Sequence, residues 1–275
     1  MSYKTILVQA DLPDTVANGI RLASQLANAY EAHLVGFALS GADQAIAQCN
    51  AAVAGMVALP TDMSALTEKA DAQLAAFAKQ AQGYGVSSYE TRRIDDTPDY
   101  ALVMQARYAD LLVMPQGDSS GTPSAVLQYV MLHGGKPVLI VPTASKVEQI
   151  GQAPLLAWDG GQQAARAINA ALPLLQRAGK ATLAVFNGTE HYAAHGQQPG
   201  ADMATYLARQ GVQVEVVQKT TKQPIGTALL ELAAELKADL LVMGGYGHSR
   251  LREIALGGAT RDVLKQMNLP VLMTH

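Results

Sequence analysis

The sequence predicts an α/β protein of two tandem units, each with a mainly parallel sheet that helices cover on both faces. Two observations favour this fold. Apolar runs of strand length alternate with segments of helical periodicity along the 275 residues. In addition, "YADLLVMPQG" from Tyr108 echoes "KADLLVMGGYG" from Lys237, and "KPVLIVP" from Lys136 echoes "LPVLMTH" from Leu269. The echoes indicate two related halves with the same order of elements.

In the first half, helices are expected where apolar residues recur every three or four positions, and strands where short apolar runs stand between turns. Positions 16, 20, 22, 23 and 26 form one helical face, and positions 66, 70, 74, 77 and 81 form another that stops at the glycines of "GYGV". The predicted strands cover 5–10, 32–40, 88–94, 110–115 and 136–142, and the predicted helices cover 15–30, 66–81, 98–109 and a short segment before 136.

The second half repeats this order. Its central strands are nearly continuous apolar runs, as burial on both faces of a parallel sheet requires. The last helix is expected to stop at Asn268, because asparagine can adopt the left-handed conformation of a helix cap. The predicted strands are a run that ends before Asp159, then 180–187, 212–219, 239–244 and 269–275, with helices over 165–179, 201–211, 225–238 and 259–267.

The polar connector "PTASKVEQIGQAP" joins the last strand of the first half to the first strand of the second. We place the domain boundary inside it, which gives units of residues 1–148 and 149–275. The echoing strands "PVLIVP" and "PVLMTH" are expected to lie side by side. This pairing would bury two sheet edges and imitate a dimer within one chain.

Composition excludes several classes of function. The formal net charge of −3 and the pI near 6.1 leave no basic surface for a nucleic-acid backbone. No apolar run has the 18 or so residues of a membrane span, and the first apolar run is too short for a signal peptide. We therefore expect a cytoplasmic protein without nucleic-acid or membrane partners.

Candidate reactive residues do not assemble into a catalytic or metal site. Cys49 is the only cysteine, so no disulfide or thiolate cluster is expected. His191 and His195 have the spacing of a helical metal pair, but no third ligand is evident and glycines and a proline follow them. His248 and Ser249 are adjacent, and adjacent residues rarely face one another as base and nucleophile. The sequence thus predicts neither catalytic residues nor a metal site.

Glycines gather beside the strand that ends at Gly244. Gly244 and Gly247 follow the apolar run, and Gly257 follows after nine further residues, just before the predicted last helix. Ligands of open α/β sheets bind beyond the carboxyl ends of strands, and the first turn of a helix suits a phosphate. Glycine lets a phosphate lie close to the main chain because no Cβ intervenes. An ordinary turn stays the alternative for the glycines taken singly.

The spacing resembles the G-x2-G-x9-G-(S/T) signature of the universal stress protein family, and the echoes extend the resemblance to nearly the whole chain. The resemblance implies two Rossmann-like, adenine nucleotide alpha hydrolase-like α/β sandwiches with five-stranded sheets. It also implies an adenine nucleotide, ATP or AMP, with or without Mg²⁺, in the second half. The nucleotide-binding residues carried over by position, with their neighbours in the loop, are Ala157, Asp159, Phe186, Met243, Gly244, Gly247, His248, Arg250, Gly257, Gly258, Ala259 and Thr260.

The resemblance implies that Gly244 and Gly247 line the phosphates and that the carboxylate of Asp159 holds the ribose or base. It also implies that Ala157 and Phe186 lie near the adenine. Arg250 suits phosphate oxygens, although pairing with Glu253 is an equal alternative. Gly258 stands where the signature has a hydroxyl residue, and Thr260 either replaces that hydroxyl or faces its own helix. The first half has "MPQGDSSGTPSAVLQYV" without the glycine spacing, so no nucleotide is expected there.

The resemblance predicts a stress-response sensor or regulator rather than a dedicated enzyme. Two alternatives stay open: a slow ATP hydrolase or nucleotidyl-transferring enzyme on the same site, and an adaptor whose glycine loop binds no nucleotide. The expected partners are the nucleotide and a protein not identified by the sequence. The chain is also expected to be able to dimerise through a further face.

Overall fold

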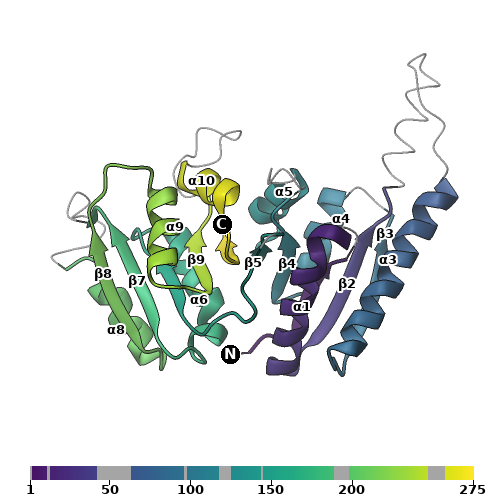
Figure 1. The fold of residues 1–275 in the computed structure, drawn as a ribbon, viewed down its shortest axis with the longest axis horizontal. Coiled ribbons are helices and arrows are strands. Elements are labelled where there is room, and N and C mark those ends of the chain that lie inside the picture. The colour runs from purple at the N-terminus through teal and green to yellow at the C-terminus, as the bar shows by residue number, and fades with distance from the viewer. Residues whose placement is uncertain are drawn as a thin grey trace, which may run out of the picture.

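The computed structural model describes residues 2–10, 13–41, 63–95, 98–117, 125–143, 145–188, 198–246 and 258–275. Within each half, strands and helices alternate in the predicted order (Figure 1). The strands are β1 Thr5–Gln9, β2 His33–Leu39, β3 Tyr89–Ile94, β4 Leu111–Pro115, β5 Val138–Val141, β6 Pro154–Ala157, β7 Ala181–Phe186, β8 Val214–Lys219, β9 Leu240–Gly244 and β10 Val271–Thr274. The helices are α1 Pro13–Tyr30, α3 Met63–Gly83, α4 Pro98–Ala106, α5 Ala125–His133, α6 Gln162–Leu175, α8 Ala201–Arg209, α9 Ile225–Glu235 and α10 Gly258–Gln266.

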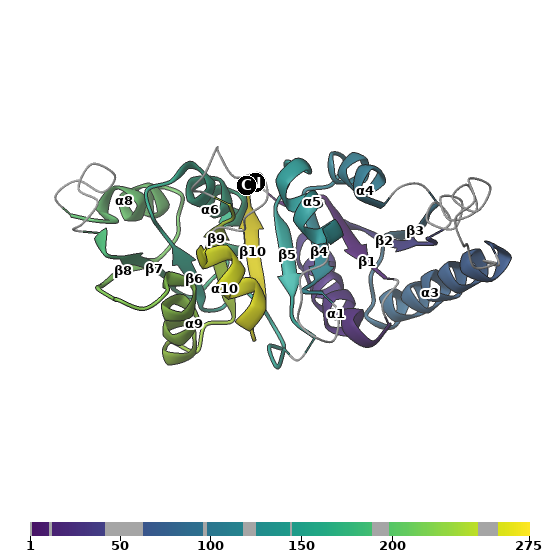
Figure 2. The ribbon, with the colours of Figure 1, turned by 90° about the horizontal axis from the view of Figure 1, so that it is seen from above.

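The described strands form one sheet in the order β3-β2-β1-β4-β5-β10-β9-β6-β7-β8. Neighbours within each half are parallel, and β5 pairs antiparallel with β10 at the centre, with Leu139 opposite Leu272 (Figure 2). The predicted pairing of "PVLIVP" with "PVLMTH" is therefore confirmed. Within the described ranges each half contributes five strands to this sheet, and the two halves have the same strand order, which confirms the predicted α/β fold class.

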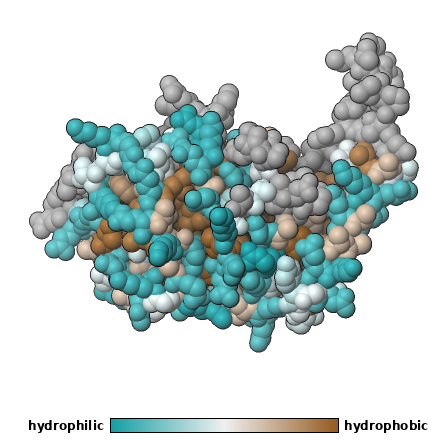
Figure 3. Space-filling model, viewed as in Figure 1, coloured by the Kyte–Doolittle hydropathy of each residue, from teal (hydrophilic) through white to brown (hydrophobic). Residues whose placement is uncertain are grey.

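Burial explains the two kinds of strand. The side chains of β4, β5 and β10 are buried throughout, as expected for strands covered on both faces. The outermost strands β3 and β8 have exposed and half-exposed side chains, several of them charged, and such side chains discourage pairing at an open sheet edge. Hydrophilic side chains lie over much of the described surface in Figure 3, with hydrophobic ones showing between them.

Two apolar cores lie on opposite faces of the sheet, and each contains residues from both halves. One core is covered by α1, α3, α6 and α8, and the other by α4, α5, α9 and α10. Since the cores run across the β5–β10 pair, the halves share their hydrophobic interior. The domain boundary before residue 149 stays a prediction, and this position lies in the connector between β5 and β6.

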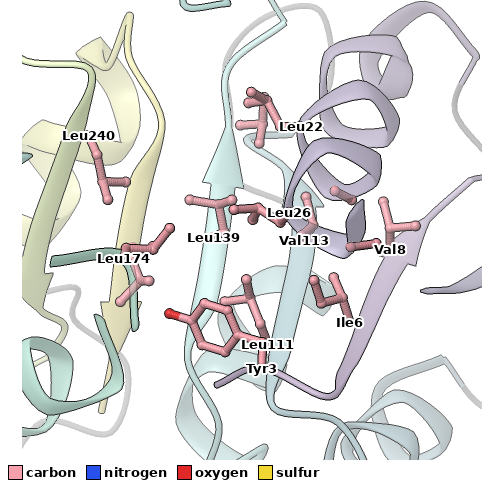
Figure 4. Close-up of a cluster of buried hydrophobic side chains, with 14 of the residues drawn as sticks. Tyr3, Ile6, Val8, Leu22, Leu26, Leu111, Val113, Leu139, Leu174 and Leu240 are labelled. Carbon is pink, nitrogen blue, oxygen red and sulfur yellow. The ribbon is translucent and has the colours of Figure 1, made fainter. Parts of the chain in front are cut away.

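Two tyrosines of the first half anchor α6 of the second. The hydroxyl of Tyr3 donates to Ala170 O and that of Tyr30 donates to Pro173 O, both at 2.8 Å. Their rings meet edge to face, and the guanidinium of Arg177 lies 5.0 Å from the centre of the Tyr30 ring. In Figure 4 the Tyr3 hydroxyl points toward the side on which Leu174 lies. Burial raises the pKa of Tyr3 above its ordinary value.

The echoed aspartates hold the start of each half. The carboxylate of Asp239 accepts the N–H groups of Gly151, Gln152 and Ala153 at 2.6 to 3.1 Å. The carboxylate of Asp110 accepts those of Lys4 and Thr5 at 2.7 and 3.0 Å. Each aspartate precedes the fourth strand of its half and fixes the chain that enters the first strand.

Candidate functional site

The strand order places a switch point between β6 and β9. From β6 the chain proceeds outward to β7 and β8, and then returns to β9 on the other side of β6. Crossovers diverge at such a point, and ligands of open α/β sheets bind beyond the carboxyl ends of the strands there. The two strands end at Ala157 and Gly244. Both residues were predicted from the sequence as part of the site.

Asp159 follows β6 in an exposed turn. Its Oδ1 accepts the N–H of Gly161 at 2.7 Å, and Gly160 between them has a φ of +76°. A Cβ on Gly161 would lie 2.8 Å from that oxygen, so a larger residue there would require the carboxylate to shift. This turn starts α6 at Gln162, earlier than the helical periodicity predicts. The aspartate therefore has a structural function beside the predicted one.

Gly244 is packed against the first turn of α6. A Cβ there would lie 2.6 Å from Ala164 N and 2.7 Å from the carbonyl carbon of Gln163, closer than real Cβ contacts. The need for glycine at this position thus comes from helix packing against β9. Met243 precedes it with a side chain only 4% exposed in the core, so only its main chain can face a ligand.

The chain leaves β9 through Gly245 and Tyr246, just before the segment 247–257 that we call the glycine loop after Gly247 and Gly257. Tyr246 has a φ of 61°, unusual for a bulky side chain, and its N–H donates to Thr260 Oγ1 at 3.2 Å. The ring stands edge-on to that of His275, with 6.2 Å between centres. Its hydroxyl is buried and has no recorded partner among the described residues, and burial raises the pKa of Tyr246 to about 12.

The first turn of α10 contains the predicted residues Gly258, Ala259 and Thr260. Gly258 is exposed, and no described atom lies within 4 Å of a Cβ built on it. Thr260 is only 4% exposed, and its hydroxyl oxygen holds the entry of the loop. In the described structure Thr260 Oγ1 thus accepts a hydrogen bond from the N–H of Tyr246. Neither of the two roles that the sequence suggests for Thr260 includes this contact.

The predicted adenine contacts lie on adjacent strand ends. Ala157 ends β6 with Ala184 of β7 as its register partner, and Phe186 ends β7. Both side chains are half-buried and pack against the core that α9 and α10 cover. Four predicted residues fall outside the described part of the chain: Gly247, His248, Arg250 and Gly257. The residues Cys49, His191 and His195 also lie outside it.

Two helix N-termini converge on the end of β9. The first turn of α6 contacts Gly244, and the first turn of α10 is tied to Tyr246 through Thr260. Each N-terminus presents N–H groups without intrahelical partners and the positive end of a helix dipole. An anion at this edge would meet positive potential from both helices, while exposed Asp159 offers a carboxylate to hydroxyl donors.

A cavity between described residues lies elsewhere. It has a volume of about 510 Å³ and lies between the last turns of α1 and α6 and the connector at Gln149–Gln152. These helix ends lie at the amino edge of the sheet, because α1 leads into the start of β2. Within the described ranges, no group of three His, Cys, Asp or Glu side chains could hold a metal, and no helix is long and apolar enough to span a membrane.

Sequence reasoning missed the contacts of Tyr246, Asp110 and Asp239. The echo "ADLLVM" contains both aspartates and could have pointed to them, because a repeated acidic residue before a buried strand needs a partner. The contact between Tyr246 and Thr260 has no such signal, since the two residues stand 14 positions apart across the glycine loop.

The universal stress protein family model matches residues 155–275. Universal stress protein Slr1230 of Synechocystis is 40% identical over 45 residues, which is 16% of this chain and 16% of its own. Universal stress protein MJ0577 of Methanocaldococcus jannaschii is 38% identical over 45 residues, which is 16% of this chain and 28% of its own. Each match thus spans less than a third of the curated relative.

The likeness in fold is wider. The crystal structure of a universal stress protein from Archaeoglobus fulgidus covers 98% of this chain and 95% of its own at 16% identity, with a TM-score of 0.75. This structure spans both halves and shows the fold of the whole chain. The second half of the chain thus matches the universal stress protein family model, and the chain as a whole has the fold of this solved structure.

Proposed function

We propose that the second half binds an adenine nucleotide beyond the carboxyl ends of β6 and β9, and that the protein acts as a sensor or regulator. The observation that carries the proposal is the convergence of three features at one switch point. These are the exposed carboxylate of Asp159, the first turn of α6 against Gly244, and the first turn of α10 at Gly258. The match of residues 155–275 to the universal stress protein family model supports the same ligand class.

The residues present fit such a ligand. Phosphates would lie toward the first turns of α6 and α10, where N–H groups lack intrahelical partners. Asp159 would accept hydrogen bonds from ribose hydroxyls, and Ala157 and Phe186 would contact the base from the ends of β6 and β7. Space at Gly258 leaves the start of α10 unobstructed by described atoms. The protein would bind and orient the nucleotide. Its conformation would depend on whether the nucleotide is bound, and a partner protein would recognise that difference.

The test is calorimetric titration of ATP and AMP into protein stripped of small molecules, with mass spectrometry of what denaturation releases. We expect one site per chain. Asp159→Asn keeps an oxygen for Gly161 but loses the charge, and should weaken binding about five-fold, since charged acceptors form the stronger hydrogen bonds. Asp202→Asn, an exposed aspartate on α8, is the matched control and should bind as the wild type does.

Each alternative gives a different result in the same experiment. Phosphate or pyrophosphate release that grows with time, and stops in Asp159→Asn, would favour the slow hydrolase or nucleotidyl-transferring enzyme. Absence of released nucleotide and of binding heat would favour the adaptor and overturn the proposal. A cytoplasmic location, a nucleotide-free first half and a homodimer stay predictions.

A further inference from the structure

Gln116 in the first half occupies the position of Gly245 in the second. Each residue follows the fourth strand of its half, and its N–H donates to the last strand of that half. The acceptor for Gln116 is Val141 O at 3.1 Å, and the acceptor for Gly245 is Thr274 O at 2.8 Å. The main chain is therefore equivalent at the two positions, and only the side chain distinguishes them.

The side chain of Gln116 crosses into the other half. It is 8% exposed, and its Nε2 donates to Leu264 O on α10 at 2.7 Å. The equivalent contact in the second half is apolar: a Cβ on Gly245 would meet Met131 Cε of α5 at 3.3 Å. The two strand ends thus approach each other's last helix, but a hydrogen bond is recorded only for Gln116.

Leu264 stands in the last turn of α10, which ends at Gln266. Carbonyl groups of a last helical turn have no intrahelical donor and need a partner from elsewhere. Val263 O accepts the N–H of Met267, and Leu264 O accepts the side chain of Gln116. A residue 148 positions away therefore caps the helix from the other half of the chain.

The opposite end of α10 is part of the proposed nucleotide site. The helix has nine residues, about 13 Å at the usual rise, so its two ends move together as one short rod. Its first turn begins at Gly258 and is tied to the loop entry through Thr260 and Tyr246. A restraint on Leu264 therefore also restrains the first turn.

We propose that Gln116 is a positioning residue that orients α10, so that the first half, which lacks the glycine spacing, sets the geometry of the nucleotide end of the second. The consequence for binding rests on the proposed function. Gln116 does not contact the ligand in this arrangement. It acts through the helix that it caps.

The test is Gln116→Met, which keeps the length of the side chain and removes the donor. Hydrogen exchange followed by mass spectrometry is measured on the whole, ligand-free chain. We expect peptides from residues 258–269 to exchange about ten-fold faster than in the wild type, because the uncapped helix opens more often. Peptides from β1, β2 and α1 should be unchanged.

The matched control is Gln9→Met. Gln9 is 7% exposed at the end of β1, and no hydrogen bond from it to α10 is recorded among the described residues. It should not change exchange in α10. If Gln116→Met fails to unfold cooperatively, Gln116→Asn replaces it, since the shorter side chain keeps the amide but cannot span to Leu264. Exchange in α10 equal to the wild type would overturn the proposal.

Calorimetry with ATP separates this proposal from the proposed function. We expect Gln116→Met to bind about three-fold more weakly than the wild type at a temperature where both are folded, with Gln9→Met unchanged. Faster exchange in α10 with unchanged affinity would overturn transmission to the site. A wild type that binds no nucleotide would refute the proposed function, while the exchange data would still decide whether Gln116 holds α10.

Discussion

Thr260 Oγ1 accepts the N–H of Tyr246, and this hydrogen bond ties the first turn of α10 to the residue where the glycine loop leaves β9. The backbone of Tyr246 has a left-handed conformation, which is unfavourable for a bulky residue. The hydrogen bond to Thr260 helps to hold this conformation and thereby the direction in which the chain leaves the sheet. The hydroxyl oxygen lies inside the protein rather than at its surface.

Thr260→Val should therefore destabilise the protein by about 1 kcal/mol, since the N–H of Tyr246 would lose its acceptor. Thr260→Ser keeps the oxygen and should be closer to the wild type. Denaturant unfolding measures the two free energies. Equal losses of unfolding free energy in the two variants would mean that side-chain packing, and not the hydrogen bond, decides the effect.

Gly244→Ala should destabilise the protein by about 2 kcal/mol or more, because its Cβ would overlap the backbone of α6 at Ala164. Backbone atoms cannot yield as the end of a side chain can. Thermal and denaturant unfolding are the measurements, and Gly83→Ala is the control, since a Cβ there meets no described atom within 4 Å. A stable Gly244→Ala would contradict the packing of α6 on β9.

Gly258→Ser should have little effect on unfolding, since a Cβ at this position meets no described atom within 4 Å. It restores the hydroxyl of the signature that the chain resembles. We expect affinity for ATP to rise about five-fold, which corresponds to one added hydrogen bond of about 1 kcal/mol. Calorimetry measures the change. Unchanged ATP affinity would show that the hydroxyl does not reach the phosphates.

Asp239→Ala should destabilise the protein by about 2 kcal/mol, because three N–H groups of the connector lose a charged acceptor. The groups are partly exposed, so water replaces some of the loss. Asp110→Ala removes two such bonds and should cost less. Reversal of this order in denaturant unfolding would contradict the assigned networks.

Tyr246→Phe should change the stability at alkaline pH. The pKa of Tyr246 is raised from 10.0 to about 12 in the folded protein, because burial disfavours the phenolate. This contribution is complete below pH 10 and is lost as pH rises toward 12, where the unfolded chain ionises first. The variant should show a smaller loss of unfolding free energy between these values than the wild type. Identical alkaline profiles would contradict the burial of the hydroxyl.

The same variant tests the hydroxyl at neutral pH. Because the hydroxyl is buried without a recorded described partner, its removal should leave stability unchanged or raise it slightly. A loss above about 1 kcal/mol would show that the group has a hydrogen-bond partner.

Much of the fold could be predicted from the sequence because it depends on local patterns. Alternating periods predict the strands and helices, and the echo of "KPVLIVP" in "LPVLMTH" predicts two equivalent edge strands that bury one another. The positions of Ala157, Asp159 and Gly244 at strand ends follow from the same patterns. The start of α6 could not be predicted as well, because the carboxylate of Asp159 and the conformation of Gly160 set it.

The sequence by itself determined the order of elements, the two related halves and the strand edge at which ligand chemistry is expected. The tertiary structure decided what individual residues do there. Gly244 accommodates α6, Thr260 holds the loop entry, and Gln116 caps α10 from the other half. The physical reason is the separation of the interacting residues along the chain. Hydrophobic periodicity depends on neighbouring positions and can be seen in the sequence. The hydrogen bond between residues 116 and 264 forms only when both halves have packed on one sheet.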